Sequence, residues 1–230
     1  MSDRDLILLH GALGDASQLT PLVAKLGTAR RITVIELEGH GKTPFRDRPL
    51  RIDTLAESVV EAMDARAIER ASFFGYSMGG YVALRVAATA PARVERIATL
   101  ATKFAWTPEI ATHETAMLDA ATIRAKVPKF AAALEARHTG AGWEALLAQT
   151  ADLMRALGAH PVLTDSVLAS ITKPVRIGVG DHDATVSVEE SAAAAKQLPE
   201  GELEVHPRTA HPFEKAPLDR IARSIDEFFA

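Results

Sequence analysis

The sequence predicts an α/β fold, a mainly parallel sheet of about six strands with helices on both faces. Short apolar runs alternate with longer segments of helical spacing, which is typical of repeated βα units. The 230 residues, 47% of them hydrophobic, are enough for one sizeable core. The alternation stops between Lys103 and Leu168, where helical spacing continues without a convincing strand. We therefore expect a core formed by residues 1–102 and 169–230, with a helical cap inserted at 103–168.

The expected strands are short apolar runs, and helices are expected between them. In chain order the strands are Asp5–Leu9, Arg31–Ile35, Ala71–Phe74, Val94–Leu100, Val175–Val179 and Leu203–His206. The helices of the core are expected at Leu19–Leu26, Thr54–Ile68, Met78–Ala90, Val188–Leu198 and Leu218–Phe229. Asp53 precedes the second helix and is suited to cap its N-terminus, because its carboxylate can accept hydrogen bonds from the first backbone N–H groups.

The cap is expected to cover the site with apolar side chains. A helical insertion between two parallel strands falls at the carboxyl ends of the strands, where ligands bind in this architecture. The side chains of this segment that we expect in the substrate pocket are Phe104, Trp106, Phe130, Trp143 and Met154. For any one of them, a place in a small core of the cap itself is the more common outcome.

Charge and composition limit the partners. The formal net charge of −4 gives no electrostatic reason to expect nucleic acid. The apolar run at residues 6–9 is too short for a signal-peptide core or a membrane span, and the chain has no cysteine. We therefore expect a cytoplasmic protein, a monomer or a homodimer, that acts on a small molecule and has no nucleic-acid or membrane partner.

Gly75-Tyr76-Ser77-Met78-Gly79 is a G-x-S-x-G motif that lies between an expected strand and an expected helix. In that context the glycines relieve crowding in a sharp strand-to-helix turn, and the serine hydroxyl is exposed at its apex. The pattern also occurs by chance, but its flanks favour a catalytic serine. We therefore predict Ser77 as a nucleophile, which requires a base, an acid that orients the base, and donors for an oxyanion.

The base is expected to be a histidine on a loop just past a strand. His211 lies five residues beyond the last expected strand and before the final helix, and it is the first choice. His206 closes that strand and is predicted to be structural. Solvated imidazoles are expected for the cap histidines His113, His138 and His160. Asp181 and Asp183 both follow the fifth expected strand, and either carboxylate could orient His211.

Two backbone N–H groups are candidates for binding the oxyanion. The Met78 N–H comes directly after the expected nucleophile, at the start of a helix whose dipole favours negative charge. The loop after the first strand, residues 9–14, has two glycines that let the backbone approach a ligand, and the Ala12 N–H is the candidate there. Neighbours of these groups that we also expect in the pocket are His10, Gly11, Leu13 and Tyr76.

No metal or phosphate site is expected. His113-Glu114 begins the pattern of a zinc protease, but Met117 stands where the second histidine is needed. The residues at 41–43 imitate the end of a P-loop, but Glu36 stands where the first glycine is required.

The order of these motifs resembles that of the α/β-hydrolase superfamily, and the resemblance covers nearly all of the chain. The matching motifs are the turn at Ser77, His10-Gly11, Glu36-Leu37-Glu38-Gly39-His40-Gly41, Gly180-Asp181-His182-Asp183 and Ala210-His211. The resemblance selects Asp183 over Asp181 as the acid. It also implies an oxyanion hole formed by Ala12 and Met78. It is nearest to small capped esterases and to enol-lactonase-like and menaquinone-pathway-like members.

The chain departs from the superfamily pattern in two places. It begins at the strand that is usually third, so the antiparallel leading strands are expected to be missing. The turn usually written Asp-x-Pro-Gly-His-Gly has Glu36 and Glu38 instead.

These residues together predict a serine hydrolase that cleaves small to medium carboxylic esters without a cofactor. His211 removes the proton of Ser77, Asp183 orients the imidazole, and an acyl-enzyme forms that water then releases. Two alternatives stay open. One is the same triad used for C–C bond hydrolysis, lyase chemistry or cofactor-free perhydrolysis, and the other is a ligand-binding module with residual hydrolase activity.

Overall fold

The computed structural model describes residues 5–28 and 30–230, so residues 1–4 and 29 of the expected core lie outside the described part. Six parallel strands form one sheet in the order β2-β1-β3-β4-β5-β6. Their bounds are β1 Asp5–Leu9, β2 Arg31–Ile35, β3 Ala71–Tyr76, β4 Val94–Leu100, β5 Val175–Gly180 and β6 Gly201–His206. The expected parallel sheet is confirmed, with β3 and β5 longer at their carboxyl ends and β6 longer at its start.

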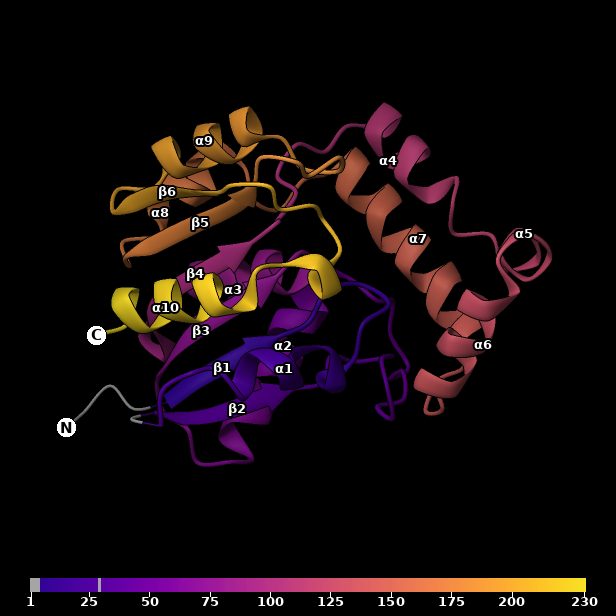
Figure 1. Ribbon diagram of the computed structural model, residues 1–230, viewed down its shortest axis with the longest axis horizontal. Coiled ribbons are helices and arrows are strands. Elements are labelled where there is room, and N and C mark those ends of the chain that lie inside the picture. Colours follow the sequence, from indigo (N-terminus) through magenta and orange to yellow (C-terminus); the bar gives the residue numbers. More distant parts are fainter. Residues whose placement is uncertain (1–4, 29) are drawn as a thin grey trace.

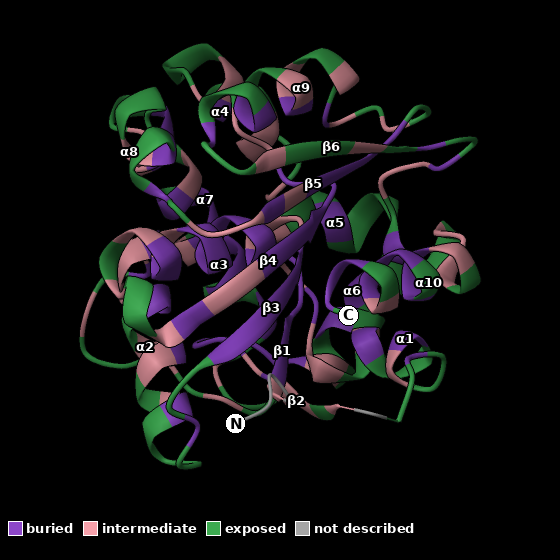
Figure 2. Cartoon of the chain, turned by 90° about the vertical axis from the view of Figure 1, so that its left-hand side faces the viewer, coloured by how far each residue is buried: buried purple, intermediate pink, exposed green. Residues whose placement is uncertain are grey.

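Helices cover both faces of this sheet (Figures 1 and 2). On one face lie α2 (Ile52–Asp64), α3 (Met78–Thr89) and α9 (Val188–Gln197), and on the other α1 (Thr20–Val23) and α10 (Leu218–Phe228). Successive strand residues point to opposite faces, so Ile7 and Leu9 pack with the first group while Leu6 and Leu8 pack with the second. The central strands β1 and β3 are buried on both faces because both faces are covered there. None of the helices in the described ranges is long and apolar enough to cross a membrane.

The start of α2 differs from the expected one. The helix begins at Ile52 rather than at Thr54, and the N-cap is Arg51, whose N–H donates to Thr54 Oγ1 at 3.0 Å. The expectation of Asp53 as the N-cap is wrong, because its carboxylate lies inside the first turn and forms an ion pair with Arg85 at 2.5 Å. Asp53 therefore pairs with Arg85 of the neighbouring helix α3 instead of capping α2.

Two further helix bounds differ. α2 ends at Asp64 rather than at Ile68, because Ala67 has a φ of 53°, which a right-handed helix does not contain. The helix expected at Leu19–Leu26 is divided into a 3₁₀ turn at Ala16–Leu19 and the four-residue α1.

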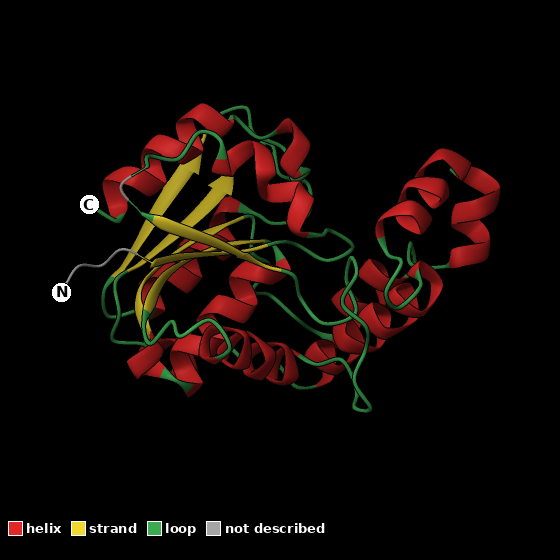
Figure 3. Cartoon of the chain, turned by 90° about the horizontal axis from the view of Figure 1, so that it is seen from below, coloured by secondary structure: helices red, strands yellow, loops and turns green. Residues whose placement is uncertain are grey.

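Between β4 and β5, where every residue is described, the chain forms five α-helices. They are α4 (Pro108–Thr115), α5 (Ala120–Lys126), α6 (Pro128–Arg137), α7 (Trp143–Ala159) and α8 (Asp165–Ser170). α4 packs against α7 and α5 against α6, on the side of the molecule toward which the strands run (Figure 1). Figure 3 shows part of this group standing apart from the sheet. α8 instead contacts α3 and α9, so the chain already returns to the core at this helix.

Truncation of a core side chain tests the packing between the sheet and its helices. Phe73 on β3 is fully buried in the cluster that joins the sheet to α2 and α3. We expect Phe73→Ala to lower the free energy of unfolding by about 3–5 kcal/mol, because it removes a large buried side chain and leaves a cavity. Urea denaturation followed by circular dichroism measures this change.

Phe130→Ala is the matched control, because Phe130 lies on α6 with 45% of its surface exposed. Its free energy of unfolding should stay within about 0.5 kcal/mol of the wild-type value. Equal losses in the two variants would contradict the assignment of Phe73 to the core.

Candidate functional site

The turn from β3 into α3 holds Ser77 in a strained backbone conformation. Ser77 has φ 50° and ψ −118°, which residues with a side chain rarely adopt. Strain of this kind persists only where surrounding contacts maintain it. The Ser77 N–H donates to the Leu100 carbonyl at 2.8 Å, and the Ser77 carbonyl accepts from Thr102 Oγ1 at 3.0 Å. The end of β4 therefore fixes both sides of the serine.

Two glycines of the motif permit this turn through close backbone contacts. A Cβ atom on Gly75 would lie 2.4 Å from the Gly80 Cα, and one on Gly79 would lie 2.4 Å from the Leu9 carbonyl oxygen. Both distances are far below van der Waals contact, so a side chain at either position would push α3 away from the sheet. The G-x-S-x-G spacing is thus required by packing at this turn.

His211 lies between Ser77 and Asp183. Its Nε2 is 3.5 Å from Ser77 Oγ, and its Nδ1 is 2.8 Å and 3.1 Å from the two carboxylate oxygens of Asp183. An ionised carboxylate only accepts hydrogen bonds, so Nδ1 carries the ring proton and Nε2 can accept one. The arrangement can therefore move the hydroxyl proton of Ser77 onto the imidazole.

Asp183 is held ionised by its neighbours. Its side chain has no exposed surface, and Oδ1 accepts from the backbone N–H groups of Thr185 at 2.8 Å and Val186 at 2.9 Å. Burial opposes its ionisation, but the hydrogen bonds from His211, Val186 and Thr185 hold the pKa of Asp183 below its ordinary value. A negative charge therefore stands beside Nδ1 over the neutral pH range.

Asp181 has a different position. Its Oδ1 accepts from the Thr209 N–H at 3.3 Å, and the His182 N–H donates to the Thr209 carbonyl at 3.1 Å. The residue that sequence reasoning left as an alternative acid thus fastens the loop that carries His211, and Asp183 is the carboxylate beside the imidazole.

The two expected oxyanion donors belong to residues that lie in the same pocket as Ser77. Ala12 and Met78 both line the pocket that contains its hydroxyl. Met78 is the first residue of α3, and the first N–H groups of a helix have no acceptor within the helix. Within residues 5–28 and 30–230, no hydrogen bond uses the Ala12 N–H. Both groups are therefore available to a developing oxyanion, and the N-terminal end of α3 adds a favourable dipole.

The pocket above Ser77 has a volume of about 270 Å³ and lies between the sheet and the cap. Three of the residues expected in it line it, namely Tyr76, Trp106 and Met154. Met117, another apolar side chain of the inserted segment, lines it as well. Sequence reasoning missed the apolar residues Ile52, Tyr81, Leu118, Leu153 and Leu157 and the polar residues Gln18, Lys103, Glu114 and Thr185. Tyr76 also donates its hydroxyl proton to the His211 carbonyl at 2.8 Å, which ties the base to the end of β3.

Three aromatic residues expected in the pocket do not line it. Trp143 is buried in the cap's own cluster with Leu147, and the Arg124 guanidinium lies 5.1 Å from its ring centroid. Phe130 projects toward solvent. Phe104 packs beside Tyr81 with a ring separation of 6.4 Å and lies outside the pocket lining. Their positions depend on how the cap helices pack, which helical spacing does not specify.

His10 and His40 form a buried layer behind the loop after β1 rather than part of the pocket lining. His10 donates from Nδ1 to the Gly11 carbonyl at 2.8 Å, and its Nε2 accepts from the Leu37 N–H at 3.1 Å. The His40 ring lies 5.0 Å from the His10 ring, and its Nδ1 donates to the Glu38 carbonyl. Burial lowers the pKa of His10 to about 4 and lowers the pKa of His40 well below its usual range. Both rings are therefore neutral.

His138 extends this layer into the cap, so the expectation that it is solvated is wrong. Its side chain is buried, and its ring lies 5.9 Å from that of His40. Its Nδ1 accepts from the Gly41 N–H at 2.9 Å, and its Nε2 donates to the Leu13 carbonyl at 3.1 Å. The Leu13 side chain packs in the cap cluster rather than in the pocket. His138 thus joins the end of α6 to the loops after β1 and β2, and no local pattern in the sequence indicates such a contact.

Gly11 also lies outside the pocket lining, directly beneath it. A Cβ atom at Gly11 would lie 2.8 Å from the Tyr76 ring and 3.3 Å from Ser77 Cβ. The absence of a side chain therefore lets the oxyanion loop approach the serine.

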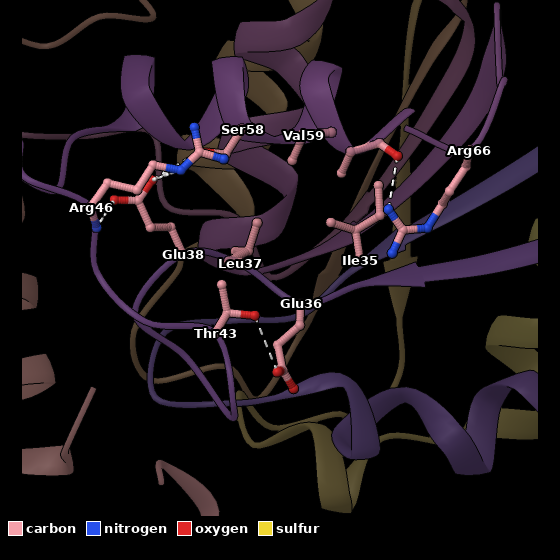
Figure 4. A pocket seen from close by; sticks show the side chains of 10 residues that line it. Ile35, Glu36, Leu37, Glu38, Thr43, Arg46, Ser58, Val59 and Arg66 are labelled. Atoms are coloured by element: carbon pink, nitrogen blue, oxygen red, sulfur yellow. Dashed lines mark hydrogen bonds and ion pairs between the residues drawn. The ribbon is translucent and has the colours of Figure 1, made fainter. Parts of the chain in front are cut away.

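A second hollow, of about 220 Å³, lies between the end of β2 and α2 (Figure 4). Its buried carboxylate, Glu38, accepts hydrogen bonds from the Arg46 N–H, Arg48 Nη2 and Ser58 Oγ at 2.9–3.1 Å. Burial opposes the ionisation of Glu38, but these contacts hold its pKa below the ordinary value. No histidine is among the described residues that line this hollow, so it offers no base for a nucleophile. We therefore assign the candidate site to the pocket at Ser77.

Comparisons with known proteins agree with this geometry. A family model described as the alpha/beta hydrolase fold matches residues 6–171. Esterase YbfF of Escherichia coli (strain K12) is 30% identical over 92 residues, which are 40% of this chain and 36% of that protein. The pimeloyl-[acyl-carrier protein] methyl ester esterase of Pectobacterium atrosepticum is 35% identical over 97 residues, which are 42% of this chain and 36% of that protein. The matched part of the chain thus spans little more than a third of the length of these two relatives.

Solved structures extend the likeness to the whole fold. The enol-lactonase from Burkholderia xenovorans LB400 superimposes with a TM-score of 0.78 at 21% sequence identity. The superposition covers 99% of this chain and 92% of that one. At this identity the likeness concerns the fold alone.

The histidine layer makes stability depend on pH in a defined direction. The pKa of His10 falls from its ordinary value of 6.5 to about 4 on folding, so between these pH values the unfolded chain binds a proton that the folded chain does not. The free energy of unfolding should therefore fall as the pH drops from 6.5 toward 4, by up to about 1.4 kcal/mol per pH unit for this group. Urea denaturation at half-unit pH steps measures the slope.

The slope should become shallower in His10→Asn, which removes the titrating ring. His113→Asn is the control, because 84% of the His113 side chain is exposed and its substitution should leave the slope unchanged. A slope that is the same in His10→Asn and in the wild type would show that His10 is not the group responsible.

Proposed function

This chain belongs to the alpha/beta hydrolase fold family, and from that premise we propose that it is a serine esterase for small to medium carboxylic esters. The observation that carries the proposal is the line of contacts from Ser77 Oγ through His211 to Asp183. It combines a hydroxyl, an imidazole with a free Nε2, and a buried carboxylate that fixes the ring, which are the parts of a nucleophilic triad.

In the first step Ser77 attacks the ester carbonyl while His211 Nε2 takes the hydroxyl proton. The imidazolium that forms is stabilised by the adjacent Asp183 carboxylate. The carbonyl oxygen becomes an oxyanion, and the N–H groups of Ala12 and Met78 are the donors that we assign to it. His211 then gives its proton to the departing alkoxide, so the alcohol leaves and an acyl-serine remains.

In the second step water repeats this sequence on the acyl-serine. His211 takes a proton from water as its oxygen attacks the acyl carbon, and the same two N–H groups bind the second oxyanion. Collapse of this intermediate returns the proton from His211 to Ser77 and releases the carboxylic acid. No metal or organic cofactor takes part in this sequence.

The pocket supports an acyl group of limited length. Its volume of about 270 Å³ and its mostly apolar lining suit a short to medium chain better than a long one. The names of two sequence relatives, an esterase and a methyl ester esterase, support the ester as the bond that is cleaved.

A series of p-nitrophenyl esters with acyl chains of increasing length tests both the reaction and the pocket. We expect kcat/KM to be highest for short to medium chains and to fall for long ones, because a long chain exceeds the pocket. Ser77→Ala should lower kcat by several orders of magnitude and should no longer react with a fluorophosphonate probe. Release of p-nitrophenolate and gel fluorescence measure the two effects.

Ser166→Ala is the control, since Ser166 is an exposed serine on α8 outside the pocket. Turnover that survives in Ser77→Ala would refute the proposed nucleophile. Probe labelling at Ser77 without turnover of any ester in the series would point instead to C–C hydrolysis, lyase or perhydrolase chemistry, or to a ligand-binding role.

A pair of amide substitutions tests the assignment of the acid. Asp183→Asn should lower kcat/KM by about 10²–10⁴-fold, because an amide does not stabilise the imidazolium and can favour the wrong tautomer. Asp181→Asn keeps the size of a neighbouring side chain that contacts Thr209 instead, and it should change kcat/KM by less than about tenfold. Steady-state kinetics on one ester suffices, and the reverse order of effects would overturn the assignment.

A further inference from the structure

The charged side chains around the pocket at Ser77 differ in whether a group of opposite charge lies beside them. Both groups on its surface that can carry positive charge have a carboxylate partner. His211 has the buried Asp183, and Lys103 Nζ lies 3.8 Å from Glu190 Oε2 and donates to the Thr185 carbonyl at 2.9 Å. The side chains of Lys103 and Glu190 are only 15% and 11% exposed. The cationic groups are therefore neutralised within the protein.

Glu114 is the acidic residue on the pocket surface, and it lacks such a partner. It lies near the end of α4 with 18% of its side chain exposed. Across the described residues no hydrogen bond reaches its carboxylate, and no ion pair joins it to Lys103. The one basic group within ion-pair distance is His113 Nδ1, at 3.9 Å, and 84% of that side chain is exposed.

A carboxylate in this position loses much of its hydration without gaining a hydrogen bond. Removing an ionised carboxylate from water is unfavourable unless a donor or an opposite charge compensates it. The neighbouring lining residues Met117 and Leu118 offer no side-chain donor. The missing partner can therefore come from a molecule that enters the pocket, and an ammonium group supplies both the positive charge and the N–H donors.

We propose that Glu114 is a specificity-determining residue that selects esters carrying an ammonium group in addition to the ester bond. This inference rests on the proposed esterase function and specifies its substrate class. The ammonium can belong to the acyl part or to the alcohol part of the ester, since the chemistry at Glu114 is the same in both cases. Its ion pair with Glu114 would hold the substrate while the apolar lining contacts the carbon chain.

Two pairs of substrates of nearly equal shape test the proposal. Methyl 6-aminohexanoate carries an ammonium group at the end of its acyl chain, where methyl heptanoate has a methyl group. 6-Aminohexyl acetate and heptyl acetate differ in the same way on the alcohol side, with an ammonium group in the first where the second has a methyl group. In at least one pair, kcat/KM of the wild type should be higher for the cationic ester, by about 10–100-fold. Titration of the released acid at constant pH measures all four rates.

Glu114→Gln keeps the size of the side chain and removes its charge. It should abolish most of the preference for the cationic ester, measured as the ratio of the kcat/KM values of the two esters of a pair. Glu109→Gln is the matched control, because it makes the same change on the same helix at an exposed position outside the pocket. A wild-type preference for the neutral esters in both pairs, or an unchanged preference in Glu114→Gln, would overturn the proposal.

A binding measurement separates failure of this proposal from failure of the esterase function. Calorimetry with n-butylammonium and n-butanol uses the Ser77→Ala protein, with and without Glu114→Gln. Tighter binding of the ammonium than of the alcohol, lost in the double variant, supports the role of Glu114 even if no ester is cleaved. Equal binding by both proteins refutes that role, even if Ser77-dependent esterase activity is found.

Discussion

The left-handed backbone turn at Ser77 is the constraint on which the geometry of the site depends. It turns the chain from β3 into α3 at a single residue, so Met78, the first residue of α3, directly follows the serine and lines the same pocket. Such a turn is unfavourable by about 1–3 kcal/mol on its own. Hydrogen bonds to Leu100 and Thr102 compensate it, and both partners come from the neighbouring strand β4 or the loop after it. The position of the Ser77 hydroxyl thus depends on the packing of the sheet.

Part of the attachment of residues 103–168 to the core consists of hydrogen bonds that require a neutral histidine. His138 accepts a hydrogen bond from one core loop and donates one to another, so one of its ring nitrogens must stay unprotonated. His10, on the core side, likewise donates a hydrogen bond from Nδ1 and accepts one at Nε2. A proton added to either ring would turn its acceptor into a second donor facing an N–H group. The loop that carries Ala12 therefore lies over a layer whose hydrogen bonds depend on the absence of charge.

The meeting of Ser77 with His211 was predictable from their places after strands, whereas only two of the five residues expected in the pocket from the inserted segment, Trp106 and Met154, line it. Ser77 and His211 follow strands, and the carboxyl ends of parallel strands meet at one edge of the sheet, so order along the chain was enough to bring them together. The choice between Asp181 and Asp183 required the family resemblance, because local sequence does not determine the direction in which a side chain points. Trp143 lies in the cap's own core instead of the pocket, because only the crossing of cap helices decides which face of a helix is covered.

The negative charges of the carboxylates around the pocket differ in how well a neighbouring positive charge balances them, and this difference affects release of the product. Asp183 and Glu190 are matched by His211 and Lys103, whereas among the described residues Glu114 has only the exposed His113 ring within ion-pair distance, at 3.9 Å. A neutral ester meets no repulsion from this arrangement. In the proposed reaction, however, hydrolysis creates a new carboxylate in the same volume, and like charges in a partly dehydrated pocket repel each other more strongly than in water. The uncompensated charge therefore favours release of the acid over its retention, except where the acid carries its own ammonium group.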